Sequence, residues 1–182
     1  MRWLTIVVGA GLIGCLLDHI HVTWNVLAYT DPHPGLFGQP WWVAPEFGIG
    51  ALLLTITSPG ILDASSVRSS SRGQLFRDSI WFAGVYLASG IGAHAPILLT
   101  CLLGLALIGR VLARRMPQRE FMLMCALAIL GPTWESLLSA TGAFHYTAPD
   151  FAGVPMWLPL LYAHGALLIP ATLELSTPTS PY

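Results

Sequence analysis

Long apolar runs, separated by short polar loops, dominate the chain. They lie at about residues 3–28, 41–60, 79–91, 97–112, 121–140 and 154–173. A membrane-spanning helix needs about 20 mostly apolar residues, and the longer runs reach that length. The loops are rich in proline, glycine and serine, as turns are. The pattern predicts an all-α integral membrane protein, a single domain over residues 1–182 with six transmembrane helices.

The composition agrees with a membrane protein. The chain is 54% hydrophobic and 9% charged, with a mean hydropathy of +0.67. Soluble domains carry about 25% charged residues. The net charge of −1 gives no indication of nucleic-acid binding. The three cysteines, Cys15, Cys101 and Cys125, lie in apolar runs without metal-ligand or disulfide spacing, so we expect them to be packing residues.

The N-terminal run could also be a signal peptide. Leu12-Ile13-Gly14-Cys15 resembles a bacterial lipoprotein cleavage box. However, a single arginine precedes the run, and the run continues to about Ala28, which is long for a signal peptide. We therefore interpret it as the first membrane span.

The basic residues indicate how the helices are oriented. There is no lysine, and the six-span order places every arginine on one face of the membrane: Arg2, Arg68, Arg72, Arg77, Arg110, Arg114, Arg115 and Arg119. Loops rich in arginine stay on the cytoplasmic side. The distribution predicts that both termini are cytoplasmic.

Five ionisable residues lie within or beside the predicted spans: Asp18, His21, Glu46, Glu135 and His164. Asn25 follows Asp18 and His21 at i+7 and would share their helical face. Ionisable groups in spans are costly and face the bundle interior. They predict a central polar pocket among the first, second, fifth and sixth spans. The alternative is structural, with carboxylates and histidines paired to hold helices together.

A metal site is the next alternative, because histidine and carboxylate ligands suit zinc or iron. No two ligands have HxxxH or ExxH spacing, and His19 and His21 fall on different helix faces. We predict no metal and no cofactor.

The tryptophans divide into two groups. We expect Trp41, Trp81 and Trp157 to form an interfacial belt, where the indole ring is favoured. Trp42 and Trp134 lie close to Glu46 and Glu135 in sequence. We expect these two rings to line a lipid cavity.

Two long stretches resemble the Insig family, the sterol-sensing regulators named for insulin-induced genes. PWWVAPEFGIGALLL resembles the second span of that family. FHYTAPDFAGVPMWLPLLYAHGALL resembles its final loop and last span, including Tyr146-Thr147, Pro149-Asp150-Phe151 and Trp157-Leu158-Pro159. Gly142 occupies the expected place just before that loop. The resemblance extends from the second to the sixth span.

The resemblance implies a six-helix membrane fold around a central lipid-accessible cavity. In animals the family binds oxysterols and retains sterol-regulatory partner proteins in the endoplasmic reticulum, and the aspartate matching Asp150 matters for partner binding. Ser136 stands where the family has a pocket glutamine, while Glu46 and Glu135 replace uncharged residues. The chain thus resembles a prokaryotic homologue in a bacterial inner membrane, without the animal partners.

The leading hypothesis is a protein that binds a hydroxyl-bearing lipid, diacylglycerol- or sterol-like, and is not an enzyme. The expected lipid-binding residues are Asp18, His21, Asn25, Trp42, Glu46, Trp134, Glu135, Ser136 and His164. Asp150 and Tyr146 are expected to act in the loop, structurally or toward a partner, and the chain to form a homo-oligomer.

Two other classes of function stay open. An isomerase, hydratase or cyclase of isoprenoids would use Glu135 or Glu46 as general acid and His164 or His21 as base. A proton-coupled transporter is weaker, because the spans show no repeat.

Overall fold

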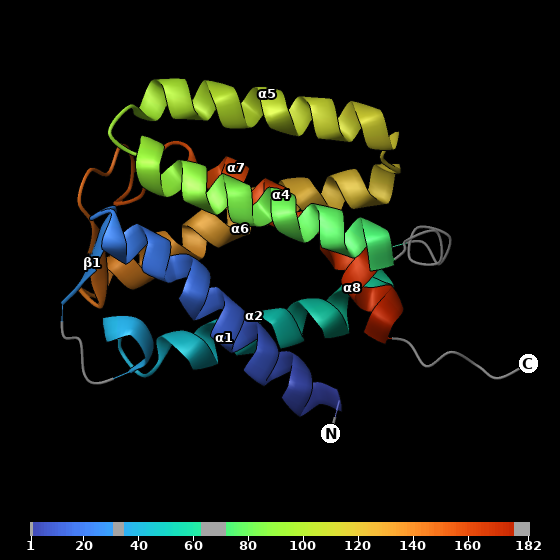
Figure 1. Ribbon diagram of the computed structural model, residues 1–182, viewed down its shortest axis with the longest axis horizontal. Coiled ribbons are helices and arrows are strands. Elements are labelled where there is room, and N and C mark those ends of the chain that lie inside the picture. The colour runs from blue at the N-terminus through green and yellow to red at the C-terminus, as the bar shows by residue number, and fades with distance from the viewer. Residues whose placement is uncertain (1, 31–34, 63–71, 177–182) are drawn as a thin grey trace, which may run out of the picture.

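A computed structural model describes residues 2–30, 35–62 and 72–176. The described chain is helical apart from one two-stranded ribbon (Figure 1). Its elements are α1 (Arg2–Thr23), β1 (Leu27–Tyr29), η1 (Leu36–Gly38), α2 (Val43–Thr57), η2 (Ser58–Gly60), α4 (Arg72–Gly92), α5 (Pro96–Arg114), α6 (Gln118–Ala140), β2 (Phe144–Tyr146), α7 (Leu158–Ala166) and α8 (Ile169–Ser176). With α7 and α8 as the two parts of the last helix, the six-helix fold predicted from the sequence is confirmed.

Three of the described helices are long and apolar enough to cross a membrane on their own: Trp3–Thr23, Pro96–Arg114 and Gln118–Ala140. The α2 helix is shorter, at 15 residues. The α4 helix carries Arg72, Arg77 and Asp78 in its first turns. The chain is a multi-pass integral membrane protein, in which the short α2 packs against α1 and the more polar α4 packs against α1, α5 and α7.

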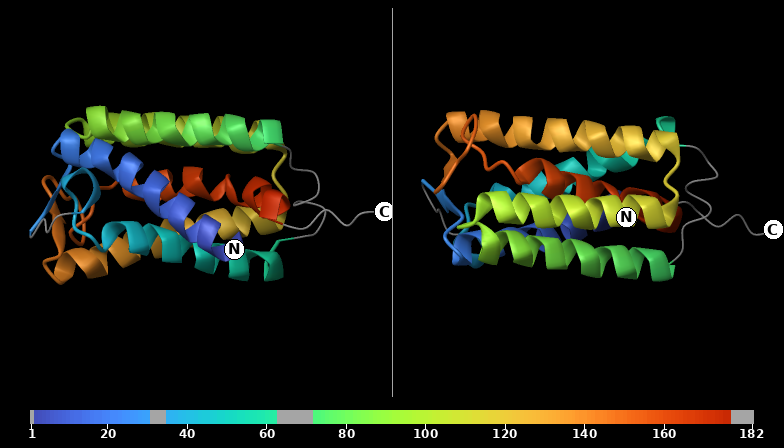
Figure 2. Two further views of the ribbon diagram at one scale, coloured as in Figure 1. Left: turned by 60° about the horizontal axis from the view of Figure 1, so that its bottom comes forward. Right: turned by 90° about the horizontal axis from the view of Figure 1, so that it is seen from above.

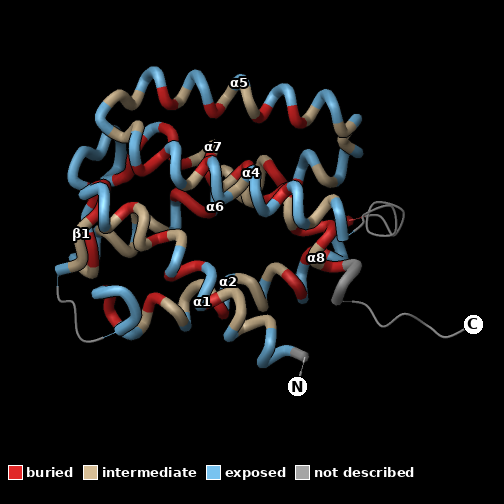
Figure 3. Tube along the Cα trace, in the orientation of Figure 1, coloured by how far each residue is buried: buried red, intermediate tan, exposed pale blue. Residues whose placement is uncertain are grey.

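The innermost helix is α7. It lies between α6 on one side and α4 and α5 on the other (Figure 2). Leu158, Leu161 and His164 on α7 are at most 2% exposed. Figure 3 shows the same contrast, with buried positions along α7 and exposed positions along the outer side of α5. A helix covered on all sides must be apolar nearly all round, so each polar residue on it requires a partner.

The α1 and α2 helices touch through their backbones. A Cβ atom built at Gly11 would lie 2.5 Å from the Ala44 carbonyl oxygen, and one at Gly48 would lie 2.5 Å from the Val7 carbonyl oxygen. Small residues allow this close approach between membrane helices. The tight pair fixes how the side chains of both helices face the rest of the bundle.

The ribbon joins the end of α1 to the segment after α6. The β1 and β2 strands are antiparallel, with Leu27 opposite Tyr146 and Tyr29 opposite Phe144. We call this end of the bundle the ribbon end. The opposite end, where α4 begins, α5 ends and α6 begins, carries the clustered arginines, and we call it the arginine end (Figure 1). Arg68 lies outside the described residues.

The first helix is shorter than the sequence predicts. It ends at Thr23, and Asn25 adopts a positive φ of 54°. The Val26 N–H bonds the His21 carbonyl at 2.8 Å, and the Asn25 N–H bonds the Val22 carbonyl at 3.1 Å. These are the two bonds of a Schellman helix end, which requires a left-handed residue. The expectation that Asn25 continues the helical face is therefore wrong.

The last helix differs from the predicted span 154–173 in where it begins and in being interrupted. It begins at Leu158 rather than Val154, because Val154 closes a tight turn with Phe151. The turn residues Ala152 and Gly153 both have positive φ, as a two-residue type I′ turn requires. The helix is also interrupted after Ala166. The α4 helix, by contrast, begins earlier than expected, at Arg72 instead of Ser79.

Candidate functional site

Three carboxyl groups from three different helices occupy the interior of the bundle toward the ribbon end. They are Asp18 of α1, Glu46 of α2 and Glu135 of α6, and we call them the central carboxyls. They are close enough to interact electrostatically with one another. All three belong to the predicted site, and the fold brings them together.

Asp18 is buried, and the protein itself satisfies it. The Tyr29 hydroxyl donates to Asp18 Oδ2 at 2.6 Å, and Gln39 Nε2 donates to the same oxygen at 2.8 Å. Gln39 also donates to the Cys15 carbonyl at 3.1 Å. The amide therefore fixes the segment before α2 onto α1, with an uncharged group beside the carboxyl.

Glu46 bridges α2 and α6. Its Oε1 accepts a hydrogen bond of 2.6 Å from the Trp134 indole. The backbones of these two helices make no extended contact in the described structure, so side chains span the space between them. One turn before Glu46, the Trp42 ring meets the edge of Tyr29 at 5.7 Å. Trp134 thus bonds a central carboxyl directly, and Trp42 contacts Tyr29, the hydroxyl partner of Asp18.

Glu135 accepts from two tyrosines, one on each oxygen. The Tyr162 hydroxyl donates at 2.5 Å, and the Tyr146 hydroxyl donates to the other oxygen. Burial raises the pKa of the Tyr146 hydroxyl well above its ordinary value, so this phenol remains a donor. Tyr162 reaches α6 because Gly131 has no side chain, and a Cβ there would fall inside the Tyr162 ring.

His21 lies beside this group but bonds to α4. Its Nε2 is 2.8 Å from Ser89 Oγ, and the Ser89 hydroxyl donates to the Tyr86 carbonyl at 2.8 Å. Since serine has one hydroxyl proton, His21 Nε2 must be the donor in their bond. Its ring stacks on Tyr86 at 4.9 Å and meets Trp157 at 5.5 Å. The predicted pocket did not include α4, the third span. The structure adds α4 to the surroundings of His21 through Ser89 and Tyr86.

His164 belongs to a different group. Its Nδ1 is 2.8 Å from an Arg110 guanidinium nitrogen, and its Nε2 is 3.1 Å from the Leu103 carbonyl. Because arginine only donates, Nδ1 accepts, and the ring proton resides on Nε2. On α7, Tyr162 and His164 are two residues apart and point to nearly opposite sides. The expected grouping of His164 with Glu135 is not what the structure shows.

Asp78, Arg110, Arg114 and His164 form what we call the buried ion network. Asp78 pairs with Arg110 at 2.8 Å and with Arg114 at 3.0 Å. Arg110 also lies 5.5 Å from the centre of the Trp81 ring. The sequence placed Asp78 just before the third predicted span and Arg110 at the end of the fourth, and it paired neither of them. The one signal in the sequence was an aspartate at the start of one apolar run and arginines at the end of the next.

The segment after α6 is held by the two side chains that the resemblance emphasised. Asp150 Oδ2 accepts the Met156 backbone N–H at 2.9 Å, which gives this side chain a structural role in the loop. The Ser136 hydroxyl donates to the Ala152 carbonyl at 2.6 Å. Both residues thus position the turn at the ribbon end, and Ser136 does not bond to the central carboxyls.

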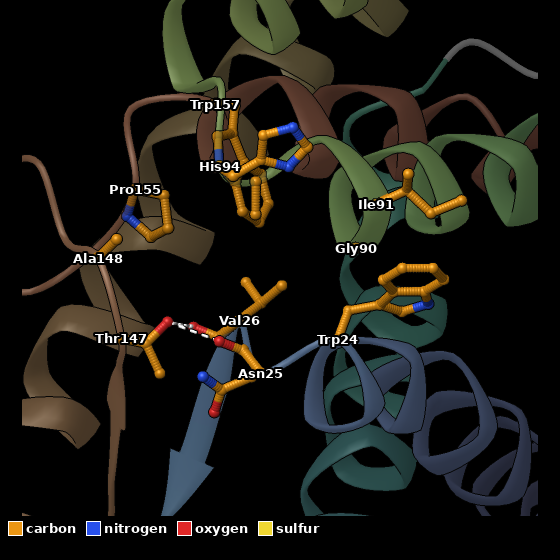
Figure 4. Close-up of a pocket in the computed structure, with 11 residues that line it drawn as sticks. Trp24, Asn25, Val26, Gly90, Ile91, His94, Thr147, Ala148, Pro155 and Trp157 are labelled. Atoms are coloured by element: carbon orange, nitrogen blue, oxygen red, sulfur yellow. Dashed lines mark hydrogen bonds between the residues drawn. The ribbon is translucent and has the colours of Figure 1, made fainter.

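The structure also contains a pocket of about 370 Å³ at the ribbon end (Figure 4). Asn25 and Trp157 line it, and the central carboxyls do not. Trp157 is 1% exposed, so the expectation that it joins an interfacial belt is wrong. Among the described residues, no group of three or more histidine, cysteine or acidic residues could hold a metal ion.

The sequence did not reveal which residues donate hydrogen bonds to the central carboxyls. They are Tyr29, Gln39, Tyr146 and Tyr162, with Trp134 as the indole donor. Tyr146 was singled out for the loop alone. Tyrosine is common at membrane boundaries, and none of these four residues lies near a carboxyl in a sequence pattern of known function, so nothing assigned them to the carboxyls.

A family described as "Protein of unknown function (DUF2878)" matches residues 75–180, from early α4 to beyond α8. The chain belongs to this family. A search of curated proteins finds no match. The matched part of the chain includes Glu135, Tyr146, Tyr162 and the buried ion network.

Two solved structures share the fold. Both are of MvINS, an Insig homologue from Mycobacterium vanbaalenii, one of them as a cross-linked trimer of a variant. Each is 19% identical to this chain, with a TM-score of 0.83, over 100% of this chain and 96% of the other. The fold is therefore that of a prokaryotic Insig homologue, as the resemblance from the second to the sixth span implied.

Proposed function

We propose that this protein binds a hydroxyl-bearing membrane lipid, diacylglycerol- or sterol-like, between the α1–α2 pair and the α6–α7 pair. One observation carries the proposal: in the described structure, the hydrogen bonds of the central carboxyls all go to uncharged donors. An apolar space with a few convergent polar groups is typical of a ligand site. A lipid hydroxyl can donate to such carboxyls without adding a charge.

The accessibility of the central residues supports a ligand. Glu46, Glu135, Tyr86 and Tyr162 are half-buried, although they lie in the interior of the bundle. Their neighbours on α7 are fully buried. These side chains are therefore less tightly enclosed than Leu158, Leu161 and His164, and the proposed lipid chain would cover them.

The second candidate function, an enzyme that acts on isoprenoids, has less support. Acid–base catalysis by Glu135 and His164 needs both groups at one site. His164 instead has both nitrogens engaged, with Arg110 and the Leu103 carbonyl. Both oxygens of Glu135 accept from tyrosines. In the described part of the chain, Glu135 therefore has no base hydrogen-bonded to it, whereas a lipid hydroxyl needs only a further acceptor position on a carboxyl oxygen.

Two further parts of the proposal concern the assembly of the protein and its orientation in the membrane. MvINS is described as a trimer in one of its structures, and we propose a homo-oligomer for this chain. The arginine positions support cytoplasmic termini in a bacterial inner membrane. The animal partner proteins of the Insig family would be absent there.

The experiment combines identification with two variants. The protein is purified in mild detergent, its lipids are extracted and identified by mass spectrometry, and the lipid found is titrated back. Trp42→Ala should weaken binding about three- to tenfold, because loss of an aromatic contact costs roughly 0.5–1.5 kcal/mol. Glu135→Gln keeps the shape and one acceptor oxygen, and its NH2 group can donate to a tyrosine hydroxyl that turns its proton away, so the variant should retain affinity within about threefold.

Two results would count against the binder. Recovery of lipids in bulk membrane proportions, unchanged by Trp42→Ala, would mean that no specific lipid is held. A product formed from a candidate isoprenoid, and lost about 10²–10⁴-fold with Glu135→Gln, would establish the enzyme instead.

A further inference from the structure

The pocket at the ribbon end is a site that the central carboxyls do not explain. Its volume of about 370 Å³ lies within the range of roughly 300–1,000 Å³ typical of ligand pockets. Four segments line it: the end of α1, the end of α4, the loop after β2 and the approach to α7 (Figure 4). Asp18, Glu46 and Glu135 are not among its lining residues.

The pocket opens beside the lipid-facing surface. Trp24, directly after α1, is 51% exposed. Ile91, in the last turn of α4, is 45% exposed. Val26 and Trp157, by contrast, are buried. In Figure 4 the Trp24 and Ile91 side chains stand across the pocket from Pro155 and Ala148. The walls thus run from buried residues to residues at the boundary of the membrane.

The walls are fixed before any ligand arrives. The Thr147 hydroxyl donates to the Asn25 carbonyl at 2.6 Å, and the Thr147 N–H donates to the Val26 carbonyl at 2.9 Å. Gly90 lets Trp24 lie flat against α4, since a Cβ there would be 3.1 Å from Trp24 Cδ1. The backbone groups of the wall therefore satisfy one another. A preformed pocket avoids the ordering cost of binding.

The chemistry of the lining selects an uncharged amphiphile. The lining contains no arginine, lysine, aspartate or glutamate. An ionic head group would lie there without a counter-ion, which is costly. The exposed imidazole of His94, at the turn between α4 and α5, can donate or accept a hydrogen bond. Trp24, Ile91 and Val26 supply apolar surface for the first methylenes of a chain.

We propose that this pocket is a second lipid site, which holds the uncharged, hydroxyl-bearing polar end of a membrane lipid at the ribbon end of the bundle. Trp157 is the wall between this site and the central carboxyls. Its ring lies 5.5 Å from His21 and 6.5 Å from Tyr146, and it also lines the pocket. The second site does not require a lipid between the α1–α2 and α6–α7 pairs.

The test is photolabelling in lipid nanodiscs. A monoacylglycerol with a diazirine near its ester group is added, irradiated and mapped by peptide mass spectrometry. Label should concentrate at 24–26, 90–94 and 147–157. Ala93→Phe fills the pocket and should abolish this label, whereas Ala88→Phe, on the exposed surface of α4, should leave it intact. His94→Ala should reduce it about three- to tenfold, the contribution of one hydrogen bond. Equal thermal stability of the two phenylalanine variants excludes misfolding as the cause.

Several outcomes would overturn the second site. Label spread evenly over the spans, or unchanged in Ala93→Phe, would mean that the pocket holds no lipid. Competition by free glycerol as strong as by unlabelled monoacylglycerol would make the ligand a soluble polyol. Equal competition by oleate would remove the preference for an uncharged group. Label confined to peptides of α2 and α6 would refute the second site while supporting the central one.

Discussion

Gly48→Ala tests whether direct contact between the α1 and α2 backbones holds the site in place. A Cβ at position 48 would lie 2.5 Å from the Val7 carbonyl oxygen and 2.8 Å from Val7 Cγ1. Favourable contact between carbon atoms begins near ~3.5 Å, so the two helices would have to separate by roughly 1 Å. Asp18 and Glu46 lie on these two helices, and their separation would change with the helices.

The size of the effect follows from that displacement. A gap of about 0.5–1 Å forfeits a quarter to a half of the dispersion energy of each contact along the interface. Overpacking typically costs about 1–3 kcal/mol, and the lower flexibility of alanine returns roughly 0.5–1 kcal/mol. We expect a net loss of about 1–2 kcal/mol, which lowers Tm by roughly 2–8 °C in a chain of this size.

The control is Gly50→Ala. Gly50 lies on the same helix and is exposed, and a Cβ added there would have no atom within 4 Å. This variant should match or exceed the wild-type Tm. Both variants are measured by thermal unfolding in the same detergent. If Gly48→Ala is as stable as Gly50→Ala, the backbone contact is not what holds α1 against α2.

Three further predictions concern the loop, the ion network and the topology. Asp150→Ala should cost about 1 kcal/mol by removing one hydrogen bond to the backbone, and Asp150→Asn should restore most of it; equal Tm values for wild type and Asp150→Ala would leave that bond without a structural role. Asp78→Asn should cost about 3–5 kcal/mol, since Arg110 then lies buried without a carboxylate; a loss under about 1 kcal/mol in thermal unfolding would show that the network is hydrated. Reporters fused at Tyr182 and inserted at Gly35 should report opposite sides of the membrane, and the same side at both would refute the six-span topology.

The sequence predicted best where one physical signal dominates. The α5 and α6 helices fall within three residues of their predicted limits, because each is a long apolar run that begins at or just after a proline. Asp18, Glu46 and Glu135 were identified for the same reason, since a carboxyl inside a span needs a partner.

The end of α1 and the partner of His164 were not predicted, because they depend on backbone conformation and on packing between distant segments. The end of α1 is set by the left-handed residue Asn25, which lies within an apolar run. His164 looked like a partner for Glu135 because both lie on neighbouring spans. It bonds to Arg110 instead, because α7 is enclosed on all sides and presents Tyr162 to α6 and His164 to α5.

The central claim is that a lipid lies between the α1–α2 pair and the α6–α7 pair. The most direct test is an experimental structure of the protein in nanodiscs made from native lipids, at a resolution that resolves acyl chains. We predict elongated density in that space, with a polar end within hydrogen-bonding distance of Glu46 or Glu135 and a chain beside Trp42. Helix pairs packed against each other, with no lipid density between them, would contradict the claim.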